Sequence, residues 1–134
     1  MSQSLTKQAI LQAKDQVLER VEVPEWGGAV YVRSITARER GIIEADAAKF
    51  RESKGKDASF ARTFTSRLAS MAICDENGER LFSDNEVDQL AGKNAAVIAR
   101  ISEVSQRLSG FSKEDVDELE KNLPQAQAGA SAID

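Results

Sequence analysis

The chain has 134 residues, a formal net charge of −4, no histidine and one cysteine, Cys74, which fits a single domain in a reducing compartment. Without histidine, Ser-His-Asp and Cys-His catalysis are excluded and the commonest zinc ligand is missing, so we expect no enzyme, no metal site and no cofactor. The acidic balance argues against nucleic acid as a partner, and because no apolar run approaches ~18 residues, we expect no membrane partner either.

The first predicted element is a short helix within Leu5–Lys14. Leu5, Ala9 and Ala13 fall on one stripe at helical spacing, with Ile10 beside it. A segment this short is marginal as an isolated helix in water. We therefore expect it to be stabilised by docking.

A β-hairpin is predicted over about residues 18–35, around the sequence VPEWGG. Four valines alternate with other residues before and after the turn and share one face: Val21, Val23, Val30 and Val32. Pro24 and the pair Gly27-Gly28 supply the turn geometry. Since an isolated hairpin is marginal in water, one of its faces must lie on helices or on another protein.

Helices are predicted over about residues 37–53, 58–73, 84–91, 94–109 and 113–122. Capping boxes start two of them, at Thr36–Glu39 and at Ser83–Glu86. Helical spacing indicates the inward residues of the longest helices: Ile42, Ile43, Ala47 and Phe50 in the first, Phe60, Phe64, Leu68, Met71 and Ala72 in the second, and Val97, Ile98, Ile101, Val104 and Leu108 in the fourth.

The predicted fold class is therefore mainly α with a small N-terminal β-hairpin, a compact single-domain helical fold. The domain should span residues 1–123. The segment after Leu123 is rich in small and polar residues, so residues 124–134 are expected to be a disordered tail.

The segment Asp75–Glu86, DENGERLFSDNE, allows two interpretations. It begins with Asp and ends with Glu after twelve residues, as an EF-hand calcium loop does, but Arg80 occupies the sixth position, where that loop needs Gly. The simpler interpretation, which we favour, is a turn at DENG followed by the second capping box. Cys74, just before the segment, is interpreted as a small apolar residue at a helix end.

Three sequence blocks, in order, resemble the tail assembly chaperones of long-tailed bacteriophages of the lambdoid, siphovirus type: VEVPEWGGAVYVRSITARER, CDENGERLFSD and ISEVSQRLSGFSKEDVDELEKN. The resemblance covers roughly Ile10 to Leu123, and its first block is the most specific. It implies a small α-rich protein that acts in the host bacterial cytoplasm without enzymatic activity and is absent from the mature virion. It also implies binding to the tape measure protein, which is kept soluble, and recruitment of the major tail tube protein by a longer, frameshifted form.

Several copies are expected to associate with one another and with the tape measure protein, which is expected to be a long helical rod. An apolar stripe on a helix, or the outer face of the hairpin, could form the groove that such a rod needs. Trp26 is either a lid on the protein's own core or an exposed anchor, because Trp brings a large apolar area at low entropic cost. The predicted partner-binding residues are Trp26, Tyr31, Phe60, Phe64 and Leu68.

Two alternatives remain open at the level of sequence. The composition equally allows an unrelated acidic adaptor that binds other proteins. A calcium-responsive module built on Asp75–Glu86 is the second alternative.

Overall fold

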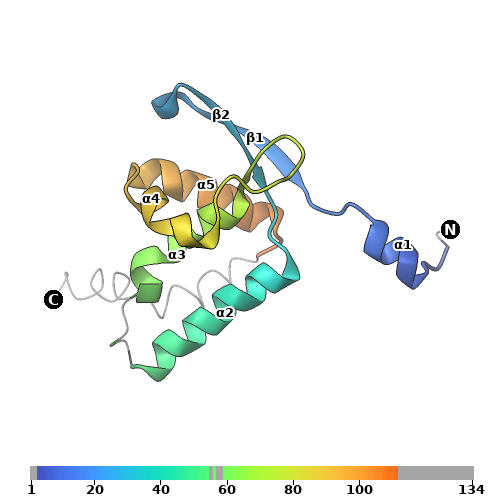
Figure 1. The fold of residues 1–134 in the computed structure, drawn as a ribbon, viewed down its shortest axis with the longest axis horizontal. Helices are drawn as coiled ribbons and strands as arrows, with labels where there is room; N and C mark the ends of the chain where they lie inside the picture. The colour runs from blue at the N-terminus through green and yellow to red at the C-terminus, as the bar shows by residue number, and fades with distance from the viewer. Residues whose placement is uncertain (1–2, 55, 57–58, 112–134) are drawn as a thin grey trace.

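The computed structural model describes residues 3–54, 56 and 59–111 of the chain (Figure 1). Its elements are, in order, α1 (Lys7–Gln12), β1 (Leu18–Val23), the 3₁₀ turn η1 (Pro24–Trp26), β2 (Gly28–Arg33), α2 (Ala37–Glu52), α3 (Ser59–Ala72), β3 (Ile73–Cys74), the 3₁₀ turn η2 (Asp84–Glu86), α4 (Val87–Ala91) and α5 (Ala95–Leu108). The predicted fold class is confirmed. The helix expected over 113–122 and the tail expected over 124–134 lie outside the described residues.

The predicted hairpin is formed by β1 and β2, which pair in antiparallel fashion. Val21 lies opposite Val30, whereas Val23 lies opposite Gly28, so only one pair of valines is directly cross-strand. The chain reverses through η1, and Gly27 follows it with a φ of +80°. That left-handed conformation is available to glycine without steric cost, which explains the residue type at this position.

The hairpin is extended to a three-stranded sheet by a strand that sequence periodicity misses. Ile73 and Cys74, expected at the end of a helix, pair instead with Val32 and Tyr31 of β2 in the order β1-β2-β3. Cys74 is 1% exposed, and its burial raises the pKa of the thiol. It therefore serves the core as a small apolar residue, in a strand rather than at a helix end.

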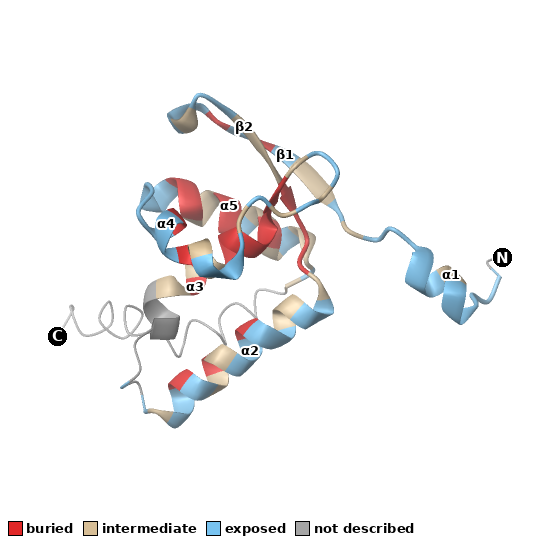
Figure 2. Cartoon of the chain, in the orientation of Figure 1, coloured by how far each residue is buried: buried red, intermediate tan, exposed pale blue. Residues whose placement is uncertain are grey.

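The apolar residues form two clusters, which meet at α3. The first lies between the sheet and the helices and contains Val21, Val23, Val32, Ala69, Ala72, Ile73, Leu90, Val97, Ile98 and Ile101. The second lies between α2 and α3 and contains Ile35, Ile43, Ala47, Phe50, Phe64, Leu68 and Met71. Figure 2 shows the buried residues along α3, α5 and the sheet, and on one side of α2 only. Because α3 contributes to both clusters, it is the central helix of the fold.

The sequence prediction is wrong for one of the four residues expected on the buried face of α2. Ile43, Ala47 and Phe50 are buried, but Ile42 is 38% exposed. Ile43, Ala47 and Phe50 lie within about 60° of one another around the helix axis, whereas Ile42 lies about 100° from Ile43, outside this stripe.

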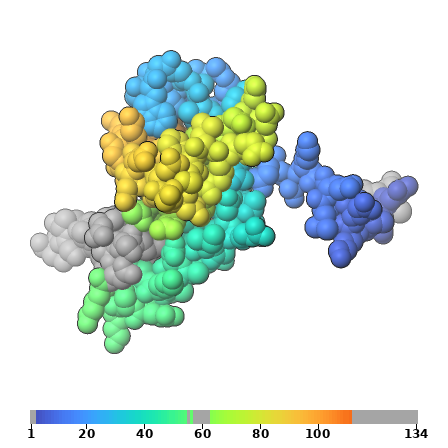
Figure 3. Space-filling model, viewed as in Figure 1, coloured from blue at the N-terminus to red at the C-terminus, as the bar shows by residue number. Residues whose placement is uncertain are grey.

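The first helix, α1, forms but does not pack on the other residues that the structure describes. It has no buried residue, and it projects from the body at the end of an extended segment (Figures 1 and 3). Its apolar side chains are solvent-exposed: Leu5 is 69%, Ile10 56% and Leu11 74% exposed. Among the residues that the structure describes, the docking expected from the sequence is therefore not made.

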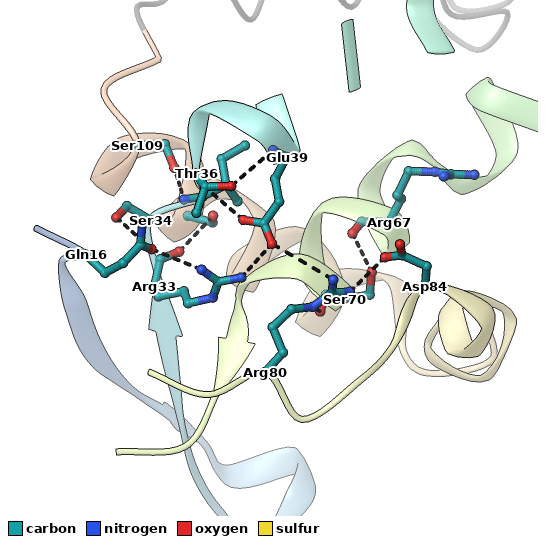
Figure 4. Close-up of polar contacts among 12 residues, drawn as sticks. Gln16, Arg33, Ser34, Thr36, Glu39, Arg67, Ser70, Arg80, Asp84 and Ser109 are labelled. Carbon is teal, nitrogen blue, oxygen red and sulfur yellow. Dashed lines mark hydrogen bonds and ion pairs between the residues drawn. The ribbon is translucent and has the colours of Figure 1, made fainter. Parts of the chain in front are cut away.

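A polar network joins β2, α2 and the segment after β3 (Figure 4). Arg33 donates a hydrogen bond to Glu39 at a distance of 2.7 Å, and the two side chains are only 7% and 12% exposed, respectively. The other carboxylate oxygen of Glu39 accepts from the amide of Thr36 at 2.9 Å, as part of the predicted capping box. Arg33 also donates to Gln16 at 3.1 Å, and Arg80 lies 3.9 Å from Glu39. Glu39 thus has two roles: it neutralises the buried Arg33, and it caps the N-terminus of α2.

Candidate functional site

Among the described residues, a hollow beside a predicted site residue lies at the tip of the hairpin. It is an open cavity of about 510 Å³ lined by Glu25, Trp26, Phe82, Gln89, Leu90 and Lys93, and we refer to it as the tip hollow. Trp26 reaches it because Pro24 and Gly27 close the chain into η1, and Leu90 reaches it from α4. Apolar side chains with polar groups around them are typical of a surface that binds another polypeptide.

A second hollow, of about 430 Å³, adjoins the first. It is lined by Arg80, Leu81, Phe82, Ser83, Asp84 and Glu86, so Phe82 borders both. Leu81 is 54% exposed beside it. The capping box predicted at Ser83 and Glu86 is formed and holds this segment. The carboxylate of Glu86 accepts hydrogen bonds from the amide of Ser83 at 2.8 Å and from its hydroxyl at 2.9 Å.

An ion pair fixes the hairpin tip to the helices. Arg100 of α5 donates to both carboxylate oxygens of Glu25, at 2.6 and 3.2 Å. The bidentate geometry sets the orientation of η1 over α5. The side-chain hydrogen bond from Arg100 lowers the pKa of Glu25 below its ordinary value of 4.5.

We expect the Arg100→Ala variant to raise the carboxyl pKa of Glu25 towards 4.5, because it removes both hydrogen bonds to the charged form. A carbon-detected NMR titration of the Glu25 carboxyl measures this midpoint. A lowered pKa in the folded state also means that the pair stabilises the fold above the unfolded pKa and loses this effect as pH falls through the folded pKa. Arg107→Ala, which breaks the Glu19 pair elsewhere on α5, is the matched control. An unchanged Glu25 midpoint in Arg100→Ala would contradict the assignment.

Trp26 is partly covered by the core and partly exposed. It is half-buried and packs against the first apolar cluster, as Val30, Phe82 and Val104 also do. Its remaining surface lines the tip hollow. Trp26 is therefore a lid on the core whose outer edge is available for contact.

Tyr31 lies on a different surface from Trp26. It is half-buried in the central strand, opposite Arg20 of β1 and Cys74 of β3. Its neighbour Val32 belongs to the first apolar cluster. Since successive residues of a strand face opposite sides, Tyr31 points to the side of the sheet away from that cluster.

Two of the three predicted residues of α3, Phe64 and Leu68, do not line either hollow. Phe64 is 5% and Leu68 0% exposed, and both belong to the second apolar cluster. Phe60 lies in α3, but its side chain is outside the described part of the structure. In this conformation Phe64 and Leu68 hold α2 on α3, so a partner cannot contact them unless these helices separate.

The segment after β3 forms a tight turn. The carboxylate of Asp75 accepts from the amides of Asn77 and Glu79 at 2.8 and 3.0 Å, and Gly78 has a φ of +86°. This is the turn at DENG that we favoured. Within the described residues, no group of three or more Cys, Asp or Glu side chains is arranged to hold a metal ion.

The sequence analysis does not predict four of the residues that line the tip hollow: Phe82, Gln89, Leu90 and Lys93. They come from a loop and a short helix about 60 residues after Trp26, and the sequence gives no sign that the hairpin tip lies against them. The only signal is the apolar pair Leu81-Phe82 in an otherwise polar segment.

The chain is similar to known proteins in its sequence pattern and in its fold. The sequence model of the family described as phage tail assembly chaperone matches residues 6–122. Among solved structures, the chain is similar to the bacteriophage HK97 tail assembly chaperone, with a TM-score of 0.56 and 19% identity over 75% of this chain and 94% of that one. No curated protein sequence matches the chain significantly. Of the helices in the described ranges, none is both long and apolar enough to cross a membrane.

Proposed function

The chain belongs to the phage tail assembly chaperone family, and from this premise we propose that it binds the tape measure protein of its phage and keeps it soluble. It does so in the host bacterial cytoplasm, before and while tail tube subunits assemble around the tape measure protein. It covers apolar surface and makes or breaks no covalent bond. It leaves before the virion is complete.

The tip hollow is the observation that supports this proposal. The half-buried Trp26 and Phe82 give it an accessible apolar lining above Leu90, which is 2% exposed, and Glu25 with Lys93 give it a charged edge. An amphipathic helix binds such a surface by inserting apolar side chains spaced three or four residues apart. Aromatic residues in a partly enclosed site contribute the most binding energy, which makes Trp26 the principal anchor.

Two further interactions belong to the same proposal. A longer form of the chain, produced by a frameshift near the end of its gene, recruits the major tail tube protein. The shorter form associates with copies of itself along the tape measure protein. Tyr31, on the opposite side of the sheet from the first apolar cluster, remains a candidate for either contact.

Co-expression with the tape measure protein of the same phage tests the proposal. We expect the tape measure protein to be soluble with the chain and to precipitate without it. Trp26→Ala should weaken its recovery in a pull-down by about 30-fold, the effect of losing a hot-spot aromatic residue.

Val17→Ala is the matched control, because Val17 is an apolar residue that is 49% exposed and lies at the other end of β1. Circular dichroism and thermal melting must show that both variants are folded. Equal recovery of the tape measure protein with folded Trp26→Ala and with the wild type would exclude the tip hollow as its binding site. A tape measure protein equally soluble without the chain would overturn the proposed function itself.

A further inference from the structure

Strand β1 forms an open edge of the sheet. The strand order is β1-β2-β3, so among the described residues β1 has a partner strand on one side only. The amide of Ser34 donates to the carbonyl of Val17 at 2.9 Å, which makes these opposite residues a hydrogen-bonded pair. Hydrogen-bonded pairs alternate with non-hydrogen-bonded pairs along antiparallel strands. The residues of β1 that bond to β2 are therefore Glu19, Val21 and Val23.

The main-chain groups of the other three residues of β1 point away from the sheet. These residues are Leu18, Arg20 and Glu22, and none of them makes another main-chain hydrogen bond within the part of the chain that the structure describes. Unpaired amides and carbonyls at a sheet edge form a ready template for a further strand. The side chains of Arg20 and Glu22 are 60% and 68% exposed, so this part of the edge is open to solvent. Figure 1 shows the hairpin at the outside of the molecule.

The sequence of this open edge restricts how it can pair with a second copy of itself. Two copies related by a twofold axis pair in antiparallel fashion, with one residue of β1 facing the same residue of its copy. At least three residues of the two β1 strands overlap when that central residue is Glu19, Arg20, Val21 or Glu22. Identical charges directly opposite each other destabilise a strand pair, which disfavours every one of these centres except Val21.

Pairing centred on Val21 also brings opposite charges together twice. Arg20 of each copy then lies opposite Glu22 of the other, on the exposed face of the sheet. Both residues belong to the set with unpaired main-chain groups, so each of these two opposed pairs exchanges both of its main-chain hydrogen bonds. On the buried face, Val21 meets its own copy. The charges of the open edge thus favour one register with a second copy and oppose its neighbours.

We infer that two copies of the chain pair through their β1 strands, antiparallel and centred on Val21. The inference rests on the proposed function, because it supplies a contact for the self-association proposed there. The contact joins the two three-stranded sheets into one continuous sheet. Since each copy uses the same surface, the contact is isologous and closes at two copies.

Charge reversal tests this register in the purified full-length chain, with no other protein present. Sedimentation velocity over a range of concentrations should show the wild type in a monomer–dimer equilibrium. Glu22→Arg should weaken dimerisation at least about tenfold, because it places an added arginine opposite Arg20 in both symmetric pairs. Adding Arg20→Glu to the same chain restores opposite charges in both pairs. The double variant should therefore dimerise within about threefold of the wild type.

Glu52→Arg is the matched control for Glu22→Arg. It makes the same change of charge at an exposed position at the end of α2, and it should dimerise as the wild type does. Circular dichroism checks that all variants are folded, which we expect because the changed side chains are exposed.

A disulfide bridge tests the centre of the pairing. In Val21→Cys each thiol faces its copy across a non-hydrogen-bonded pair, where Cα atoms are about 4.5 Å apart, a separation that a disulfide can span. Mild oxidation should therefore give a covalent dimer on a non-reducing gel. Glu19→Cys, on the same face of β1, should give none, because in this register the two thiols lie about 13 Å apart along the strands. The native Cys74 is 1% exposed and remains in both variants.

Three results would overturn the inference. They are a wild type that stays monomeric, a double charge-reversal variant that dimerises as weakly as Glu22→Arg, and a Val21→Cys variant that forms no more covalent dimer than Glu19→Cys. A wild type that associates but gives the second or third result uses another surface, so the β1 contact is then wrong and the proposed self-association still stands. Because the tape measure protein is absent, none of these results depends on whether the chain binds it.

Discussion

Replacing Glu39 with glutamine is expected to destabilise the fold by about 3–5 kcal/mol, the cost of leaving a buried charge without its partner. The side chain of Arg33 is only 7% exposed and donates a hydrogen bond to Glu39 at a distance of 2.7 Å. Glutamine still has an oxygen that can accept from the Thr36 amide, so the helix cap is retained and the change isolates the charge. Urea denaturation followed by circular dichroism measures the loss, which is a large fraction of a small domain's stability.

Glu44→Gln is the control for this prediction. Glu44 pairs with Arg40 one helical turn away at 3.4 Å, but its side chain is 60% exposed. Such surface pairs are worth about 0.3–0.5 kcal/mol. The double variant Arg33→Met with Glu39→Gln should recover part of the loss, because no unpaired charge remains buried. A loss below about 1 kcal/mol in Glu39→Gln would show that water or another group solvates Arg33.

Shortening Leu68 to alanine is expected to cost about 2–5 kcal/mol, because it removes buried methyl groups and leaves a cavity in the second apolar cluster. Leu68 is 0% exposed and lies where α2 meets α3, near Ile43 and Phe50 of the same cluster. The same denaturation experiment measures the effect. Leu68→Met, which roughly conserves volume, should cost less than about 1.5 kcal/mol.

Leu81→Ala makes the same chemical change at a position that is 54% exposed, so it should cost no more than about 0.5 kcal/mol. The comparison separates a core role of Leu68 from a role in partner binding. If Leu68→Ala were as stable as Leu81→Ala, the side chain would not be supporting the contact between α2 and α3.

Local signals predicted those parts of the fold that depend on local chemistry. The Thr36–Glu39 capping box is formed with both of its hydrogen bonds, and Pro24 with Gly27 reverses the hairpin as expected. The strand at Ile73–Cys74 was missed because two apolar residues that follow a helix also fit the helix. Only the proximity of β2 makes them a strand, and this is a long-range contact that propensity does not encode.

The candidate site was predictable in part, for the same physical reason. Trp26 stands out as the single Trp at a turn, and its half-buried position agrees with both of its interpretations. The remainder of the tip hollow comes from residues distant in sequence, such as Leu90, which look like ordinary core residues. In the same way, an apolar stripe on α3 shows that a helix face is buried but not whether the chain itself or a partner buries it.

The position of α3 has a consequence for how the molecule unfolds. It supplies Ala69 and Ala72 to one apolar cluster and Phe64, Leu68 and Met71 to the other. If either cluster opens, α3 loses the packing on one of its sides. The helix is then held less firmly, and the side chains that it contributes to the other cluster lose their support. The sheet and α2 are therefore coupled thermodynamically through this helix, in addition to the buried ion pair of Arg33 with Glu39, so the folded body should melt as a single cooperative unit.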